Sequence, residues 1–159
     1  MNRLAAFVLL ALVVTLPQAF AHGNSHSALI GKWAVDVTRL PIPADVRPKS
    51  VTISLSEADG GKWTMNVDIV DANGALTHAG GTAALDGTPV AVEGPEADTA
   101  AFKLPKPNVL VLALGKGGVP ASTRVYAAGA DGKSMVETAV YFGKDGLPIM
   151  RTNYFTRIK

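Results

Sequence analysis

The stretch SVTISLSEADGGKWTMNVDI, residues 50–69, decides the fold. Apolar and polar residues alternate over 50–56 and again over 62–69. A period of two places each apolar set on one face of a β-strand. The intervening Asp59-Gly60-Gly61 favours a tight turn, because glycine readily adopts positive φ angles. The stretch therefore predicts an antiparallel hairpin.

The same arrangement repeats outward in both directions. Asn-Gly, Asp-Gly and Gly-Gly pairs recur between short runs rich in Val, Ile, Thr and aromatic residues, which is typical of all-β domains. The predicted strands cover residues 30–37, 50–56, 62–69, 76–85, 88–92, 100–104, 109–114, 121–127, 134–142 and 149–157. We therefore expect an all-β antiparallel meander of about 8–10 strands that closes into a barrel or a strongly curved sheet.

Two of these strands depart from simple alternation. Gly80-Gly81 interrupts the strand at 76–85, which predicts a bulge or a sharp bend there. Val109 to Leu114 is apolar on both faces. Both faces of that strand should therefore be covered, or one should lie at an association surface.

The N-terminal residues have the pattern of a secretory signal. Arg3 precedes an apolar run from Leu4 to Leu16, and Ala19-Phe20-Ala21 fits a cleavage site. The apolar run is shorter than the roughly 20 residues of a spanning helix. We expect residues 1–21 to be a signal peptide, 22–29 a flexible leader and 30–159 a single β-barrel-like domain. The domain should be exported to the periplasm or secreted, without stable membrane insertion after cleavage.

The composition of the chain further restricts the class of protein. The chain has no cysteine, so disulfides cannot stabilise it. Cleavage after Ala21 would remove Arg3 from the 15 basic residues and leave 14 basic against 13 acidic residues, a formal net charge of +1. These charges are interspersed, which argues against a nucleic-acid footprint and against a polybasic membrane patch.

The sequence contains no recognisable catalytic motif. It has neither a Gly-x-Ser-x-Gly elbow nor a cysteine nucleophile. Most aspartates occupy turn positions, and Glu93, Glu96 and Asp98 form an acidic loop that we expect to be solvated. We therefore predict no catalytic residue and no cofactor, and we favour a non-enzymatic protein.

One metal site is conceivable at the mature N-terminus. Cleavage after Ala21 would make His22 the first residue, and its α-amino group and imidazole would together chelate copper. Such a site needs a further histidine, and His26 and His78 are the other two in the chain. The alternative, which we favour, is a polar leader with His78 on a strand surface.

A cross-strand ion pair is also suggested by the strand pattern. Glu137 shares a strand face with Met135 and Ala139, and Arg124 shares one with Tyr126 on the preceding strand. We expect an Arg124–Glu137 pair at the surface, because buried charges are rare. If that face pointed into a barrel, the pair would be a polar handle for a ligand.

Gly31-Lys32-Trp33 opens the first predicted strand and resembles the Gly-x-Trp signature of lipocalins. This resemblance implies that Trp33 closes the bottom of a β-barrel cup. It also implies that an arginine near the last strand, Arg157 or alternatively Arg151, packs across the indole ring in a cation–π contact.

A longer likeness covers nearly all of the chain after residue 21, which resembles small exported bacterial lipocalin-like proteins, a family without a known function. The segments that carry it are Gly31 to Leu40, Pro48 to Thr52, Val70 to Gly74, Leu85 to Gly94, Asp98-Thr99, Ala130 to Met135 and Asn153 to Phe155. The resemblance implies a lipocalin-like barrel and no catalytic residue.

Two functions suit such a barrel. The first is binding of a small apolar or amphipathic molecule in an interior lined by Trp63, Met65, Tyr126 and Tyr141. The second is a structural or protein-interaction module of the cell envelope with a solid core, whose partner contacts a sheet edge or the strand at 109–114. The copper site at His22 is a third hypothesis.

Overall fold

The computed structural model describes residues 26–159. Ten strands form one sheet in which every neighbouring pair is antiparallel. Their bounds are β1 Gly31–Val35, β2 Ser50–Ala58, β3 Lys62–Val70, β4 Leu76–Ala83, β5 Val90–Ala91, β6 Thr99–Lys106, β7 Val109–Lys116, β8 Val119–Ala128, β9 Ser134–Phe142 and β10 Pro148–Ile158. Two 3-10 turns, Val37–Arg39 and Asp59–Gly61, are the only helical elements among the described residues. The predicted all-β class and strand count are confirmed.

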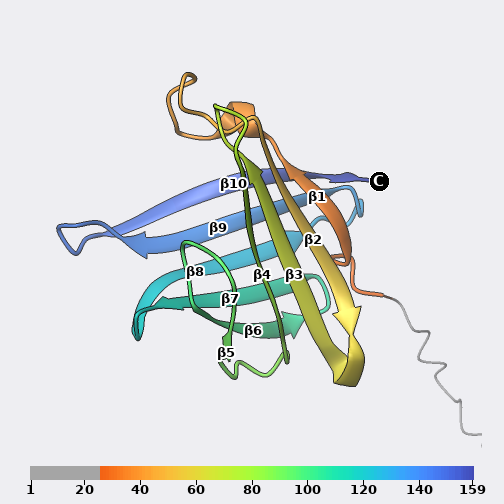
Figure 1. Cartoon of the computed structure of the whole chain (residues 1–159). Helices are drawn as coiled ribbons and strands as arrows, with labels where there is room; N and C mark the ends of the chain where they lie inside the picture. The colour runs from red at the N-terminus through yellow and green to blue at the C-terminus, as the bar shows by residue number, and fades with distance from the viewer. Residues whose placement is uncertain (1–25) are drawn as a thin grey trace, which may run out of the picture.

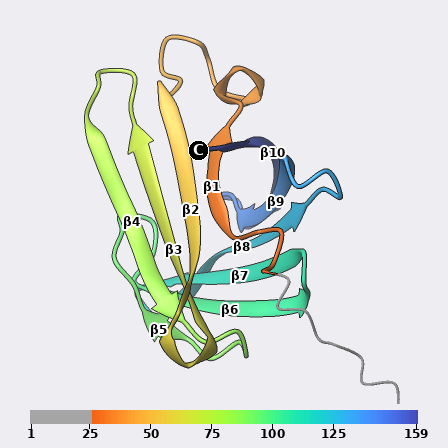
Figure 2. The ribbon, with the colours of Figure 1, turned by 90° about the vertical axis from the view of Figure 1, so that its right-hand side faces the viewer.

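The strands form an antiparallel meander in which the first and last strands pair with each other. The order is β4-β3-β2-β1-β10-β9-β8-β7-β6-β5. Each strand pairs with the next one in sequence except β4 with β5, which form the two edges, and β1 also pairs with β10. Trp33 on β1 lies between Ile53 of β2 and Arg157 of β10. The first and last strands therefore meet in the middle of the sheet, as Figures 1 and 2 show.

The curled sheet nearly closes on itself where its two edge strands approach. Gly80 of β4 and Glu93, just after β5, exchange two backbone hydrogen bonds of 2.9 Å each. This single bridge joins the edges, and Figure 2 shows β4 and β5 side by side. The result is a nearly closed β-barrel, as the sequence predicted.

The bulge expected at Gly80-Gly81 is absent. Pairing of β3 with β4 runs without a shift through Asn66↔Gly80 and Met65↔Gly81. Register shifts occur instead in the β6–β7 and β7–β8 pairs. A Cβ atom at Gly81 would lie against the side chain of Val92. The glycines therefore permit the close approach of the segment that closes the barrel.

One end of the barrel, where β1 begins and β10 ends, is filled with side chains, and we call it the packed end. Its buried residues are Leu29, Trp33, Leu55, Trp63, Ala83, Leu110, Ala128 and Met135. The Trp33 indole N–H donates to the Leu29 carbonyl over 2.8 Å. Leu29 is fully buried, although the sequence places it in the expected flexible leader. Residues 22–25 of that leader lie outside the described residues.

Arg157 covers the buried tryptophan of the packed end. Its guanidinium lies 4.2 Å from the Trp33 ring centroid. It also donates hydrogen bonds to three backbone carbonyls, those of Ala28, Ile30 and Gly132. Gly31 has a φ of 133°, and a Cβ there would collide with Arg157. The Gly-x-Trp triplet thus leaves room for the arginine that stacks on its tryptophan.

Candidate ligand-binding cavity

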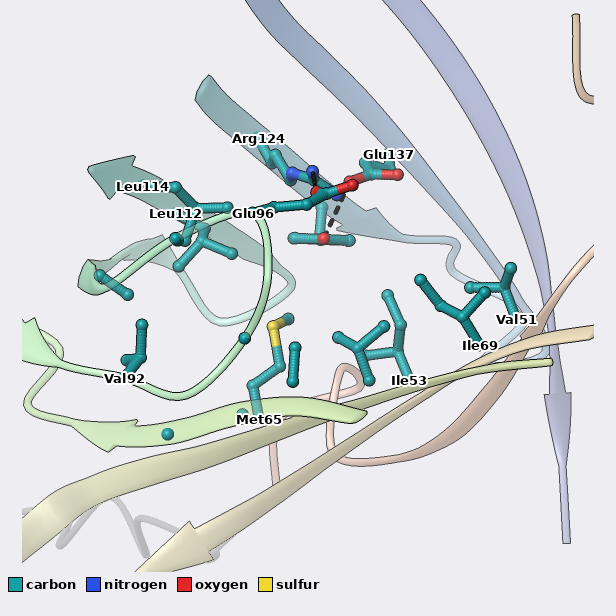
Figure 3. A pocket seen from close by; sticks show the side chains of 18 of the residues that line it. Val51, Ile53, Met65, Ile69, Val92, Glu96, Leu112, Leu114, Arg124 and Glu137 are labelled. Atoms are coloured by element: carbon teal, nitrogen blue, oxygen red, sulfur yellow. Dashed lines mark hydrogen bonds and ion pairs between the residues drawn. The ribbon is translucent and has the colours of Figure 1, made fainter. Parts of the chain in front are cut away.

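The other half of the barrel is hollow. It contains a cavity of about 190 Å³, to which every strand except β5 contributes. Most of the lining is aliphatic. The apolar side chains come from Val35, Leu40, Val51, Ile53, Met65, Val67, Ile69, Val92, Leu112, Leu114, Phe102 and Phe155. In Figure 3 the side chains of β2 and β3 face those of Leu112 and Leu114 across the space.

A polar cluster occupies one wall of this cavity. Glu137 of β9 is its centre and is 2% exposed. The Tyr126 hydroxyl of β8 donates to Glu137 Oε1 over 2.8 Å, and the Asn153 amide of β10 donates to Oε2 over 2.6 Å. Arg124 Nη1 lies 3.4 Å from Oε1. The two strands that flank β9 therefore place three donors around one buried carboxylate, which makes its burial tolerable.

The cluster perturbs the ionisation of its own members. Burial raises the pKa of Tyr126 well above its usual value of 10.0, and the adjacent Glu137 carboxylate raises it further. Burial alone would lower the pKa of Arg124, but its acidic neighbours Tyr126, Glu137 and Glu96 outweigh burial and leave that pKa raised. Tyr126 therefore remains a neutral hydrogen-bond donor and Arg124 a permanent cation.

The segment Val92–Asp98, which we call the strap, crosses the cavity. It is joined to β4 through Glu93 and Gly80, and Glu96 Oε2 lies 2.7 Å from Arg124 Nη2 on β8. Ala97 is buried, and Asp98 accepts a hydrogen bond from the Gly117 amide over 2.8 Å. Figure 3 shows Glu96 beside Arg124 and Glu137. The acidic loop expected to be solvated therefore forms part of the site, although the Glu96 side chain is 68% exposed.

The Arg124–Glu137 pair forms, but not at the surface where we expected it. The sheet curls so that the face shared by Met135, Glu137 and Ala139 points inward, and all three are buried. Burying a carboxylate is normally unfavourable, but here donors from β8 and β10 surround Glu137 and offset that cost. The alternative interpretation, a polar handle inside a barrel, matches the geometry.

Two of the four predicted lining residues reach the cavity. Met65 and Tyr126 line it. Trp63 is buried at the packed end, where it pairs with Ala83 across β3 and β4. Tyr141 is half-buried near the end of β9, and Arg151 lies 5.3 Å from its ring centroid. Neither Trp63 nor Tyr141 lines the cavity.

Sequence reasoning missed several of the residues that surround the space. Alternation along 109–114 indicates that Leu110, Leu112 and Leu114 share one face, yet the same segment is apolar on both faces, so the inner face was ambiguous. Asn153 lies in a predicted strand, and only its proximity to Glu137 reveals its role. No local pattern indicates that the strap would cover the cavity.

The histidines of the copper hypothesis contact different partners. His26 Nδ1 lies 3.3 Å from Glu57 Oε1, near the turn of the β2–β3 hairpin. His78 Nδ1 lies 2.7 Å from Asp68 Oδ1 on the β3–β4 pair. His22 lies outside the described residues. Within residues 26–159, no group of three His, Cys, Asp or Glu side chains is placed to hold a metal ion, and no helix is long and apolar enough to cross a membrane.

Comparison with known proteins identifies the fold and nothing finer. No protein-family model matches the chain, and no curated protein matches its sequence. A crystal structure of the wild-type fluorescent protein UnaG is 18% identical, with a TM-score of 0.51, over 81% of this chain and 96% of UnaG. A UnaG mutant is 16% identical, with a TM-score of 0.54, over 83% and 97% respectively. The chain therefore shares its β-barrel fold with UnaG.

Proposed function

We propose that this protein is a non-enzymatic binder that holds one small apolar or amphipathic molecule inside its barrel. The observation that carries the proposal is the cavity itself, which has aliphatic walls and a single polar cluster. Ligand sites are usually concave and mainly apolar, with a few polar groups that orient the ligand. A hollow interior also favours binding over the structural module with a solid core.

The walls suit a ligand with two chemically distinct parts. Its apolar body would displace water from the aliphatic side chains of β2, β3 and β7, with a gain of about 25 cal/mol per Å² of apolar surface buried. Its polar part would face the cluster around Glu137. Protein donors already surround the Glu137 carboxylate, so its burial does not depend on a bound ligand.

The direct test is titration with N-phenyl-1-naphthylamine, a neutral apolar dye that fluoresces in dry surroundings. We expect saturable fluorescence with one site per chain. Val67→Phe puts extra volume into the cavity and should weaken dye binding about tenfold or more, a loss of about 1.4 kcal/mol. Val67 is one of the lining residues.

A matched variant separates occupancy of the cavity from general damage. Val111→Phe makes the same change on β7, at a half-buried position that does not line the cavity. It should leave the dye affinity within about twofold of the original. Equal effects of the two substitutions, or dye binding that never saturates, would rule out a defined site in the barrel.

We also propose that the protein acts outside the cytoplasm, after cleavage between Ala21 and His22. Support comes from the apolar run, the cleavage pattern and the absence of cysteine. The full chain should be expressed in a bacterial host and fractionated, and the mature N-terminus determined by mass spectrometry. A mature chain that starts at His22 in the periplasmic fraction is expected. Any other start would remove the amino-terminal ligand of the copper hypothesis, and an uncleaved cytoplasmic chain would refute export.

A further inference from the structure

The charged groups of the cavity are unbalanced. Four charged residues line it, namely the carboxylates of Glu93, Glu96 and Glu137 and the guanidinium of Arg124. Three negative groups against one positive group give a formal charge of minus two. Arg124 is already engaged by two of the carboxylates, Glu96 at 2.7 Å and Glu137 at 3.4 Å. The site therefore has an excess of negative charge, and the cation that lines it, Arg124, is already paired.

The cavity wall also holds an acceptor that lacks a donor. Asn153 Oδ1 is buried and has no hydrogen-bond partner among the described residues. Its orientation is set by Glu137, because the Asn153 atom 2.6 Å from a carboxylate oxygen must be the amide nitrogen, which donates. The carbonyl oxygen is thereby left without a donor, on a residue that lines the cavity. Burying an acceptor without a donor is unfavourable, and a ligand that donates to it would remove that cost.

We propose that the ligand carries a nitrogen head group that donates hydrogen bonds, such as a protonated amine, on an apolar body. This inference rests on the proposed binding function and names the ligand class of that site. The head group lies beside the hydrogen-bonded Glu137–Asn153 pair, donates to Glu137 and to Asn153 Oδ1, and offsets the negative charge. The apolar body extends along the aliphatic walls of β2, β3 and β7.

A carboxylate or phosphate head group is disfavoured by the same geometry. It would add negative charge beside the buried Glu137 carboxylate, and like charges repel strongly where water is largely excluded. It would have to displace one of these carboxylates from Arg124 to find a cation. It would also leave Asn153 Oδ1 without a donor.

The test compares three probes of equal chain length, octylamine, octanol and octanoate, by isothermal titration calorimetry at pH 7. The amine is then protonated and the acid ionised. We expect octylamine to bind about tenfold or more tighter than octanoate, with octanol between them. Octanoate that binds as tightly as octylamine would overturn the inference.

Variants then assign the preference to the cluster. Glu137→Gln keeps the shape of the side chain and removes its charge, so the advantage of octylamine over octanol should shrink to about twofold or less, while octanol affinity stays nearly constant. The matched control is Glu57→Gln, the same change at an exposed position beside His26, and it should leave all three affinities unchanged. A preference that survives Glu137→Gln would overturn the assignment to this residue.

Two further outcomes keep the inference separate from the proposed function. Equal binding of all three probes, with the dye also bound, would refute the nitrogen head group and leave the binding function standing. Absence of binding by every probe and by the dye would refute both. If Glu137→Gln does not fold, as judged by circular dichroism, Asn153→Leu replaces it and should lower octylamine affinity about threefold or more by removing the free acceptor.

Discussion

The two ends of the barrel interior are built from the same strands and differ in what fills them. On β3 the inward side chains run from Trp63 at the packed end, through Met65, to Val67 and Ile69 along the cavity. At the packed end, Trp33 and Leu110 are fully buried. Along the cavity the inward positions are mainly aliphatic, with the Glu137 cluster on one wall and glycines on β4. The two ends therefore differ in how completely side chains fill the space between the strands.

This difference indicates that the packed end mainly stabilises the fold, whereas the hollow end provides the space for a ligand. Close packing at one end contributes dispersion contacts and buried apolar area, which stabilise the fold. The other end forgoes part of that packing and keeps a buried charge. A substitution at the packed end should therefore mainly lower stability, and a substitution along the cavity should mainly change ligand binding.

The largest expected contrast lies on one strand, β7, between Leu110→Ala and Leu114→Ala. Leu110 is fully buried at the packed end, so its truncation should lower the free energy of unfolding by about 3 kcal/mol. Leu114 faces the cavity and is only partly buried, so the same change should cost about 1 kcal/mol. Urea denaturation monitored by circular dichroism measures both. Equal losses would contradict the division between the ends.

The next contrast uses two arginines of β10 that each lie over an aromatic ring. Arg157→Ala removes the contact with Trp33 and leaves three carbonyls without their donor, so we expect a loss of about 2 kcal/mol. Arg151 is exposed above Tyr141, and Arg151→Ala should change stability by about 0.5 kcal/mol or less. Thermal and urea unfolding would both report the difference. A comparable loss in Arg151→Ala would show that ring stacking, and not burial, sets the effect.

Alkaline pH should reveal the buried phenol of the cavity. The pKa of Tyr126 is raised in the folded protein, so between pH 10 and 11 the unfolded chain loses this proton while the folded chain keeps it. Stability is therefore full below pH 10 and falls as the pH rises above it. Over that unit the original protein should lose about 1 kcal/mol more than Tyr126→Phe. Parallel pH profiles for the two proteins would show that the hydroxyl is not held neutral.

The smallest effect is expected at the strap. Glu96→Gln weakens an ion pair with Arg124 whose acidic partner is mostly exposed, so the free energy of unfolding should change by about 0.5 kcal/mol or less. Because the strap crosses the cavity, dye association and dissociation should both become faster, by about threefold. Stopped-flow fluorescence measures these rates. Unchanged rates would indicate that ligands enter elsewhere.

The local features of the fold were predictable from the sequence because they depend on neighbouring residues. The hairpin at 50–69 forms as β2 and β3, with continuous pairing from Ser50↔Val70 to Ala58↔Lys62. The strand at 134–142 has the bounds that alternation predicts. Gly60 and Gly61 adopt the positive φ angles expected of the turn. Period and turn chemistry are short-range properties, so a single chain displays them.

The site was less predictable because alternation groups residues on a face without saying which way the face points. Glu137, Met135 and Ala139 were correctly placed on one face, and the preference for solvated charges then pointed that face outward. Tyr126 of β8 and Asn153 of β10 are the direct cross-strand partners of Glu137, and their hydrogen bonds to its carboxylate reverse the preference.

By itself the sequence determined the all-β class, the ten strands and the turns between them. It also carries the Gly31–Trp33 triplet and the arginine that covers its tryptophan. Only the tertiary structure decided that β1 pairs with β10, that the strap joins β4 to β8, and that the interior is hollow beside Glu137. The physical reason is how far apart in the sequence the interacting residues lie. Strands and turns arise from interactions between residues a few positions apart, whereas a cavity is what remains after side chains from nine strands have been brought together.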